Sequence, residues 1–323
     1  MSYTSVILLN MGGPRNLAEV KPFLQAMFSD RRLIPLPLKP LLAPLLANLR
    51  APITRRRYAR IGGASPLNEI ARVQAEHLAL ELNADGGEQY RVTCAMRYTK
   101  PAIGDVLRSA ELRGARQIAV LSMYPQFCQA TTGSSLEELK RICRREAELP
   151  PLCVIDRYFD DEGYLAAVEE SVKQAMERAG RDPFVLFSAH GVPKKSVLDG
   201  DLYVEETRHT AMGVASRLGL REEAWQLSFQ SRLGPIRWVA PRTQDALRSL
   251  AQRGVERIVI VPISFTTENL ETLYDLDIIL VPLAQRLGIA RVIRAPALNT
   301  SPAFIRALAR IVRSADESTA FGK

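Results

Sequence analysis

Short apolar runs alternate with amphipathic helical segments along most of this chain of 323 residues. The apolar runs have the length of strands and end in small or polar residues, as the buried strands of a parallel sheet do. They cover residues 6–11, 90–96, 117–123, 153–156, 184–187, 225–229 and 258–263. Because helical periodicity returns between them, as in residues 67–83 and 164–178, the pattern predicts an α/β fold built from βαβ units.

The two halves of the chain begin alike. Residues 6–14 and 185–193 each contain an apolar strand, a polar residue, a small-residue turn and a proline. This repeat predicts two similar domains, each a parallel sheet flanked by helices, with a ligand site in the cleft between them. We place the boundary at Pro150-Pro151, which gives an N-terminal domain at 1–150 and a C-terminal domain at 151–314. The polar residues 315–323 are expected to form a frayed tail.

Candidate chemistry lies at two predicted strand ends. His190, one of only 3 histidines, follows the strand at 184–187, and Glu271 and Asp275 come after the strand at 258–263. Ligands of α/β proteins bind at the carboxyl ends of strands, and an i, i+4 spacing puts both acids on one side of a helix. Together the three side chains suit a divalent metal or proton transfer near neutral pH. A histidine that fills a turn and a solvated acidic helix face are the alternative interpretations.

Composition narrows the class of protein. The formal net charge of +8 fits an anionic ligand or membrane surface, but no basic run is interleaved with aromatic residues, which argues against nucleic acid as a partner. The 4 cysteines lack the spacing of a zinc or iron–sulfur site and suit a reducing compartment. No uninterrupted apolar stretch is long enough to span a membrane. We therefore expect a soluble cytoplasmic protein.

An unusual segment covers residues 33–57. Its first part is rich in leucine and proline, and Arg50 and Arg55-Arg56-Arg57 follow. The prolines predict that a short helix begins near Pro40 or Pro44. This segment either packs a helix on a sheet or forms a lip that covers a large apolar ligand or touches a membrane.

Several blocks, taken in order, resemble the ferrochelatases, class II chelatases that insert ferrous iron into a porphyrin in the final step of haem biosynthesis. The blocks are residues 8–14, 61–67, 96–98, 124–126, 131–135, 188–191, 200–203, 229–235 and 271–277. The resemblance covers nearly the whole chain and implies two Rossmann-like domains around a porphyrin cleft.

The resemblance also implies roles for individual residues. His190 and Glu271 match the catalytic pair and the iron ligands, and Asp275 matches an acid that continues a path for protons or metal. The segment at 33–57 matches the lip of the pocket, where peripheral contact with the inner membrane face is expected. The positions that match the porphyrin-binding residues are Met11, Ser65, Arg97 and Tyr98.

The chain departs from the family pattern in ways that bear on its chemistry. Asn269 replaces a histidine that commonly precedes the glutamate, and Ile279 replaces a further acid found in some members. The cysteine-bearing extension of iron–sulfur members is absent, so we expect no cluster and no tightly bound cofactor, with Fe2+ acting as a substrate. Asn10-Met11-Gly12 replaces the Ala-Tyr-Gly of many members that use coproporphyrin, which favours protoporphyrin IX.

The expected reaction is therefore insertion of Fe2+ into protoporphyrin IX, which forms protohaem and releases two protons. A chelatase of the same fold that uses coproporphyrin III, or another metal and tetrapyrrole, is the nearer alternative. A porphyrin or haem carrier without catalysis is the alternative from a different class.

Overall fold

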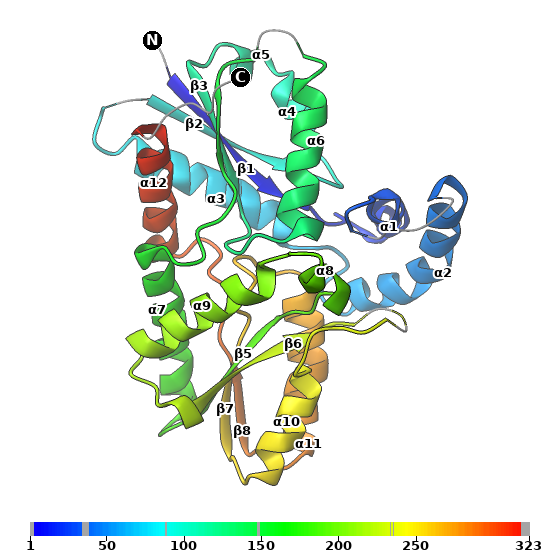
Figure 1. The fold of residues 1–323 in the computed structure, drawn as a ribbon, viewed down its shortest axis with the longest axis vertical. Coiled ribbons are helices and arrows are strands. Elements are labelled where there is room, and N and C mark those ends of the chain that lie inside the picture. Colours follow the sequence, from blue (N-terminus) through cyan, green and yellow to red (C-terminus); the bar gives the residue numbers. More distant parts are fainter. Residues whose placement is uncertain are drawn as a thin grey trace. The chain divides into compact units, whose positions relative to one another are not determined.

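The computed structural model describes residues 3–33, 39–87, 89–146, 149–232, 234 and 236–317. The chain divides into two compact units (Figure 1). The first contains the described residues up to Tyr158 together with those from Phe304 onward, and the second is Phe159–Ala303.

The first unit is built on a four-stranded parallel sheet in the order β2-β1-β3-β4. Its strands are β1 (Tyr3–Asn10), β2 (Gln89–Met96), β3 (Gln117–Ser122) and β4 (Leu152–Ile155). Every residue of β1 is buried, because this apolar strand is paired on both edges and covered on both faces. Its helices are α1 (Val20–Ser29), α2 (Lys39–Ala59), α3 (Leu67–Leu82), α4 (Ile103–Leu107), α5 (Ala110–Arg113), α6 (Ser134–Cys143) and most of α12 (Pro302–Glu317).

The second unit repeats this plan, with a parallel sheet in the order β6-β5-β7-β8. Its strands are β5 (Phe184–His190), β6 (Trp225–Gln230), β7 (Arg257–Val261) and β8 (Arg291–Arg294). Its helices are α7 (Glu162–Ala179), α8 (Lys194–Leu198), α9 (Tyr203–Arg217), α10 (Thr243–Gln252) and α11 (Val281–Arg286). In both sheets the first strand of the unit is central and pairs with the next two along the chain. The prediction of two similar Rossmann-like units is therefore confirmed.

Two segments wind as π-helices rather than as α-helices. One is short and covers Gln129–Gly133, and the other extends over Glu271–Leu280. The longer one packs Leu276 and Leu280 into the core of the second unit, beside apolar residues of α10 and β7. Pro282 lies in the first turn of α11, where the winding returns to α-helical. The sequence pattern predicts a helix here but not its winding.

The boundary between the units differs from the expected one at residue 150. β4 was assigned to the second domain, but it pairs with β3 and completes the first sheet. The last helix also belongs mainly to the first unit, where Arg313 donates hydrogen bonds to the carbonyls of Glu81 and Leu82 at the end of α3. Residues 315–317 are helical rather than frayed, and the rest of the predicted tail lies outside the described residues.

The predicted lip segment is more helical than expected. α2 is a continuous helix of 21 residues that contains Pro44 and Pro52, whereas only a short helix was predicted. Residues 34–38 of the lip lie outside the described part of the chain. No helix among the described residues is both long enough and apolar enough to cross a bilayer.

Candidate active site

His190 is the last residue of β5, and its backbone is held on both sides. Its N–H donates to Ser264 Oγ at 2.9 Å, and its carbonyl accepts a hydrogen bond from the Tyr203 hydroxyl at 3.0 Å. The imidazole lies edge-on to the ring of Phe265, with 6.1 Å between ring centroids. Burial lowers the pKa of His190, and the charge of Asp275 offsets this only in part. The ring is therefore neutral at pH 7, the state that accepts a proton or binds a metal ion.

The glycine after His190 permits a close approach of two strand ends. The N–H of Gly191 donates to the carbonyl of Gln230 at 2.7 Å, at the end of β6. A Cβ at Gly191 would lie 2.9 Å from that carbonyl, closer than real Cβ atoms come, and 3.0 Å from the carbonyl of Ser231. The small residue after the histidine is thus required by packing, and it brings β6 against the histidine turn.

The two predicted acids lie on the longer π-helix. Glu271 is its first residue and Asp275 follows four residues later, where its Oδ2 accepts a hydrogen bond from Ser231 Oγ at 2.8 Å. Asp275 is near enough to His190 for its charge to act on the pKa of the ring. The structure therefore brings Asp275 and His190 together within the second unit. Long π-helices are rare, and π-helical turns are frequent at functional sites.

Asn269, which replaces the histidine of the family pattern, has a structural role. Its Oδ1 accepts a hydrogen bond from the N–H of Thr272, and Thr272 Oγ1 accepts one from the N–H of Asn269, both at 3.0 Å. This reciprocal pair is a cap for the first free N–H groups of the helix that carries Glu271. Asn269 therefore caps this helix through its amide side chain, and the chain has no titratable group at position 269.

In the first unit, Arg97 and Tyr98 follow β2 and share one buried acid. Asp30 has a side chain only 3% exposed, and its Oδ2 accepts from Arg97 Nη2 at 2.8 Å and from the Tyr98 hydroxyl at 2.9 Å. Ser134 Oγ also donates to this oxygen, and Arg32 N–H donates to the other oxygen at 2.8 Å. Burial acts to raise the pKa of Asp30, but the Ser134 hydrogen bond and the Arg97 charge outweigh it and lower the pKa.

Met11 and Ser65 lie at the same end of this sheet. The carbonyl of Met11 accepts the N–H of Tyr98 at 3.0 Å, and Ser65 is buried against the glycine turn that follows β1. Within that turn Gly12 has a φ of 78°, and a Cβ there would lie 2.0 Å from Thr99 Oγ1. Only glycine fits this position without rearrangement. All four predicted porphyrin-binding residues thus gather at the carboxyl end of β1 and β2.

Some residues that shape these sites were not found from the sequence. Ser134 and Ser231 fall inside the family blocks, and their hydroxyl groups could have been considered as partners for an acid. Asp30 and Ser264 carry no local signal, because their partners are far away along the chain. Asp30, for example, binds Arg97 across 67 positions of sequence.

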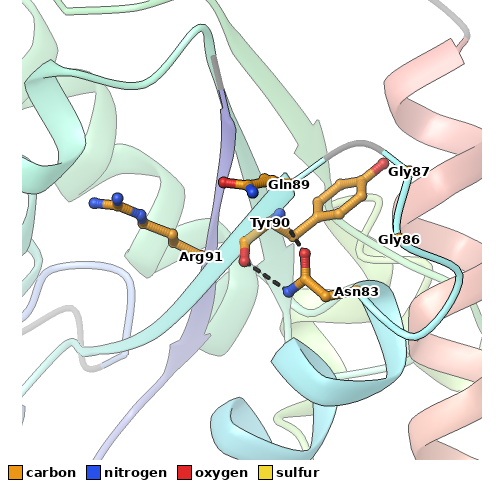
Figure 2. Close-up of a pocket in the computed structure, with 6 residues that line it drawn as sticks. All are labelled: Asn83, Gly86, Gly87, Gln89, Tyr90 and Arg91. Atoms are coloured by element: carbon orange, nitrogen blue, oxygen red, sulfur yellow. Dashed lines mark hydrogen bonds between the residues drawn. The ribbon is translucent and has the colours of Figure 1, made fainter. Parts of the chain in front are cut away.

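A separate hollow of about 300 Å³ lies where α3 leads into β2 (Figure 2). Asn83 on its wall accepts from the N–H of Tyr90 and donates to the carbonyl of Tyr90, both at 2.9 Å. These bonds, drawn in Figure 2, join the helix end to the strand. The amide is thus occupied in fixing the turn.

Comparison with solved structures defines the class of fold. The chain is similar to SirB from Bacillus subtilis, whose structure was determined with Fe3+, with a TM-score of 0.60 and 12% sequence identity. That match covers 99% of this chain and 100% of SirB. It is also similar to CbiX of denitrifying bacteria, with a TM-score of 0.55, 15% identity and coverage of 97% and 98%. The two units with their matching sheets therefore have the chelatase fold.

Sequence comparison defines the family. The Ferrochelatase family model matches residues 3–316. The ferrochelatase of Geotalea daltonii is 40% identical over 316 residues, which are 96% of this chain and 97% of that protein. The ferrochelatase of Synechococcus elongatus is 39% identical over 329 residues, covering 99% of this chain and 84% of that protein. The chain belongs to the ferrochelatase family, as the ordered sequence blocks predicted, and it is a metal chelatase that acts on a porphyrin.

Proposed function

We propose that this chelatase inserts Fe2+ into protoporphyrin IX to form protohaem. The observation that carries the proposal is the half-buried, neutral imidazole of His190 at a strand end, with Asp275 acting on its pKa. Insertion of a metal displaces two pyrrole N–H protons, so a neutral acceptor within hydrogen-bond reach lowers the barrier. His190 is the residue that we assign to this step.

The acids of the π-helix are proposed to act before and after this proton transfer. His190 and Glu271 would first hold the incoming Fe2+, which is a substrate here, through an imidazole nitrogen and a carboxylate oxygen, and that nitrogen would be free to accept a proton once the iron passes to the porphyrin. Asp275 would pass protons onward, with its carboxylate oriented by the hydrogen bond from Ser231. Met11, Ser65, Arg97 and Tyr98 are proposed to contact the porphyrin. Binding energy from such contacts can bend the macrocycle, at a strain of about 1–5 kcal/mol.

Anaerobic mixing of the purified protein with Fe2+ and protoporphyrin IX tests this proposal. The absorbance of protohaem should appear, and Glu271→Gln should lower kcat while porphyrin still binds. A matched control is Glu76→Gln, an exposed acid on α3. Porphyrin binding by the wild type without any metal insertion would instead indicate a carrier.

The choice of protoporphyrin IX over coproporphyrin III rests on Met11. Met11 follows β1 at the position where many members that use coproporphyrin have a tyrosine. Coproporphyrin has more propionate groups, so a site for it needs additional polar partners. In a competition assay with equal amounts of both porphyrins, protohaem should be the main product. A strong preference for coproporphyrin would contradict this choice.

We propose that α2 makes peripheral contact with the cytoplasmic membrane face. Its Ala43, Ala47 and Ala51 are buried, whereas larger apolar side chains four residues apart face solvent. These are Leu41, Leu45, Leu49 and Ile53, with exposures of 72%, 53%, 63% and 46%. An apolar stripe on a helix that ends in arginines is typical of an interfacial helix on an anionic bilayer.

Sedimentation with anionic lipid vesicles tests this contact. The double variant L45D/L49D should bind vesicles less than the wild type, because each aspartate puts a charge at the apolar interface. Leu80→Asp is the matched control, since Leu80 on α3 is 72% exposed and lies outside the stripe. Equal binding by the wild type and the double variant would refute membrane contact through α2.

A further inference from the structure

Arg294, the last residue of β8, holds two acids with one guanidinium group. Its Nε and Nη2 donate to the two oxygens of Asp277 at 2.5 Å and 2.9 Å. Its Nη1 donates to Glu268 Oε1 at 2.7 Å. The side chains of Arg294 and Glu268 are only 13% and 12% exposed. The fork to Asp277 is the bidentate arrangement that makes arginine–carboxylate pairs strong and directional.

Glu268 extends this grip to the start of the π-helix. Its Oε1 also accepts the N–H of Ala297 at 3.0 Å, beyond β8. Its other oxygen accepts a hydrogen bond from Thr272 Oγ1, the second residue of the π-helix. Arg294 at the end of β8 therefore bonds Asp277 directly and Thr272 through Glu268. These two π-helix residues are five positions apart.

This spacing distinguishes the two ways in which the segment could wind. In an α-helix, with 3.6 residues per turn, residues five apart point about 140° away from each other. In a π-helix, whose i→i+5 hydrogen bonds require more than four residues per turn, residues five apart point much closer to the same side. The π-helical winding therefore brings Thr272 and Asp277 toward one side of the segment, where Glu268 bonds the first and Arg294 bonds the second.

We propose that Arg294 is a positioning residue that selects the π-helical winding of Glu271–Leu280. π-Helices are usually single turns, so a segment of 10 residues requires ties from outside the helix. The winding sets the direction of every side chain on the segment, including Glu271 and Asp275. The structural part of this inference stands alone, and the effect of Arg294 on iron handling rests on the proposed function.

Hydrogen exchange followed by mass spectrometry tests the structural part. In Arg294→Met, backbone amides in residues 274–280 should exchange at least about tenfold faster, because Asp277 loses its bidentate partner and Glu268 loses its ion-pair partner. Arg291→Met is the matched control, since Arg291 lies on the same strand. Within the described residues, its guanidinium group donates hydrogen bonds to the carbonyl of Arg178 and to no acid. Asp277→Asn leaves the hydrogen bond from Arg294 to Glu268 in place, so amide exchange in the same segment should increase less than in Arg294→Met.

Steady-state kinetics test the effect on the site. Arg294→Met and Arg294→Lys should both raise KM for Fe2+ several-fold, because lysine keeps the charge but cannot form the fork. KM for the porphyrin should stay at the wild-type value. A loss of folded protein would lower kcat alone, without this change in KM for Fe2+.

Unchanged exchange in residues 274–280 in both Arg294→Met and Asp277→Asn would overturn the inference. If Arg294→Met does not fold, Asp277→Asn decides by the same measurement. If the wild type forms no haem from Fe2+ and protoporphyrin IX, the proposed function fails, while the exchange result still decides the role of Arg294.

Discussion

Replacing Asp30 by asparagine removes one buried charge and keeps the shape of the side chain. In the wild type the carboxylate accepts hydrogen bonds from Arg97, Tyr98, Ser134 and the N–H of Arg32. In the variant, the side-chain oxygen can still accept hydrogen bonds from part of this set. The NH2 group can only donate, so it can bond the hydroxyls of Tyr98 and Ser134 but cannot accept from Arg97. The Arg97 guanidinium has no acceptor capacity, so its charge loses its partner.

The structure sets the expected magnitude. Breaking a buried ion pair by removing one partner costs about 3–5 kcal/mol of unfolding free energy. The Arg97 side chain is 21% exposed, so water recovers part of this loss, and we expect the lower end, about 3 kcal/mol. For a domain of this size, this corresponds to a fall in Tm of roughly 6–12 °C.

Thermal unfolding followed by far-UV circular dichroism measures this loss. Trp225 and Trp238, the two tryptophans of the chain, both lie in the second unit, so their fluorescence reports that unit separately. Asp105→Asn is the control, because Asp105 is an exposed partner of Lys100 and should cost less than about 1 kcal/mol. A Tm for Asp30→Asn no lower than that of the control would show that the Asp30 carboxylate does not stabilise the first unit.

Acid adds a second check on Asp30. The folded protein lowers the pKa of Asp30 below its usual 3.8, so the unfolded chain binds this proton more readily. The stabilisation is present above pH 3.8 and is lost as the pH falls through the lower folded-state pKa. The difference in stability between wild type and Asp30→Asn should therefore shrink in that acidic range.

Three further predictions follow from the sites. Burial lowers the pKa of His190 below 6.5, so protonation of this group should reduce kcat/KM only below pH 6.5. A decrease in kcat/KM on the acid side that is centred above pH 6.5 would contradict this. Gly12→Ala should lower the unfolding free energy by about 1–3 kcal/mol in urea titrations, since its Cβ meets Thr99 and its φ is positive, whereas Gly87→Ala, with open space around it, should not. Glu271→Gln should reduce kcat about 10²- to 10⁴-fold with porphyrin fluorescence quenching retained, and an unchanged kcat would remove Glu271 from the mechanism.

The fold was largely predictable because buried parallel strands leave a local signal. Apolar runs at the expected positions correspond to β1, β2, β3, β5, β6 and β7. β8 gave no such signal, because arginines at both of its ends leave only two apolar residues between them. β4 was found, but its place in the first sheet depends on pairing with β3, which no local pattern encodes.

The positions of the candidate site residues were predictable where chemistry follows a strand end. His190 and Asp275 could be placed near each other because both follow strands of one sheet. The contacts of Arg294 could not be predicted from local sequence. Its hydrogen bond to Glu268 joins residues 26 positions apart, and its bonds to Asp277 join residues 17 positions apart. The π-helical winding depends on such contacts as well as on the local sequence, and the i, i+4 spacing of the acids suits both kinds of helix.

Haem formation by a matched pair of histidine variants tests whether His190 accepts the pyrrole protons. Wild type, His190→Asn and His77→Asn are compared anaerobically with Fe2+ and protoporphyrin IX, and porphyrin binding is measured in parallel by fluorescence. His77 is the control because it is an exposed histidine on α3. We expect equal rates for wild type and His77→Asn, and a rate at least about 100-fold lower for His190→Asn with porphyrin still bound. Full activity of His190→Asn would contradict this role.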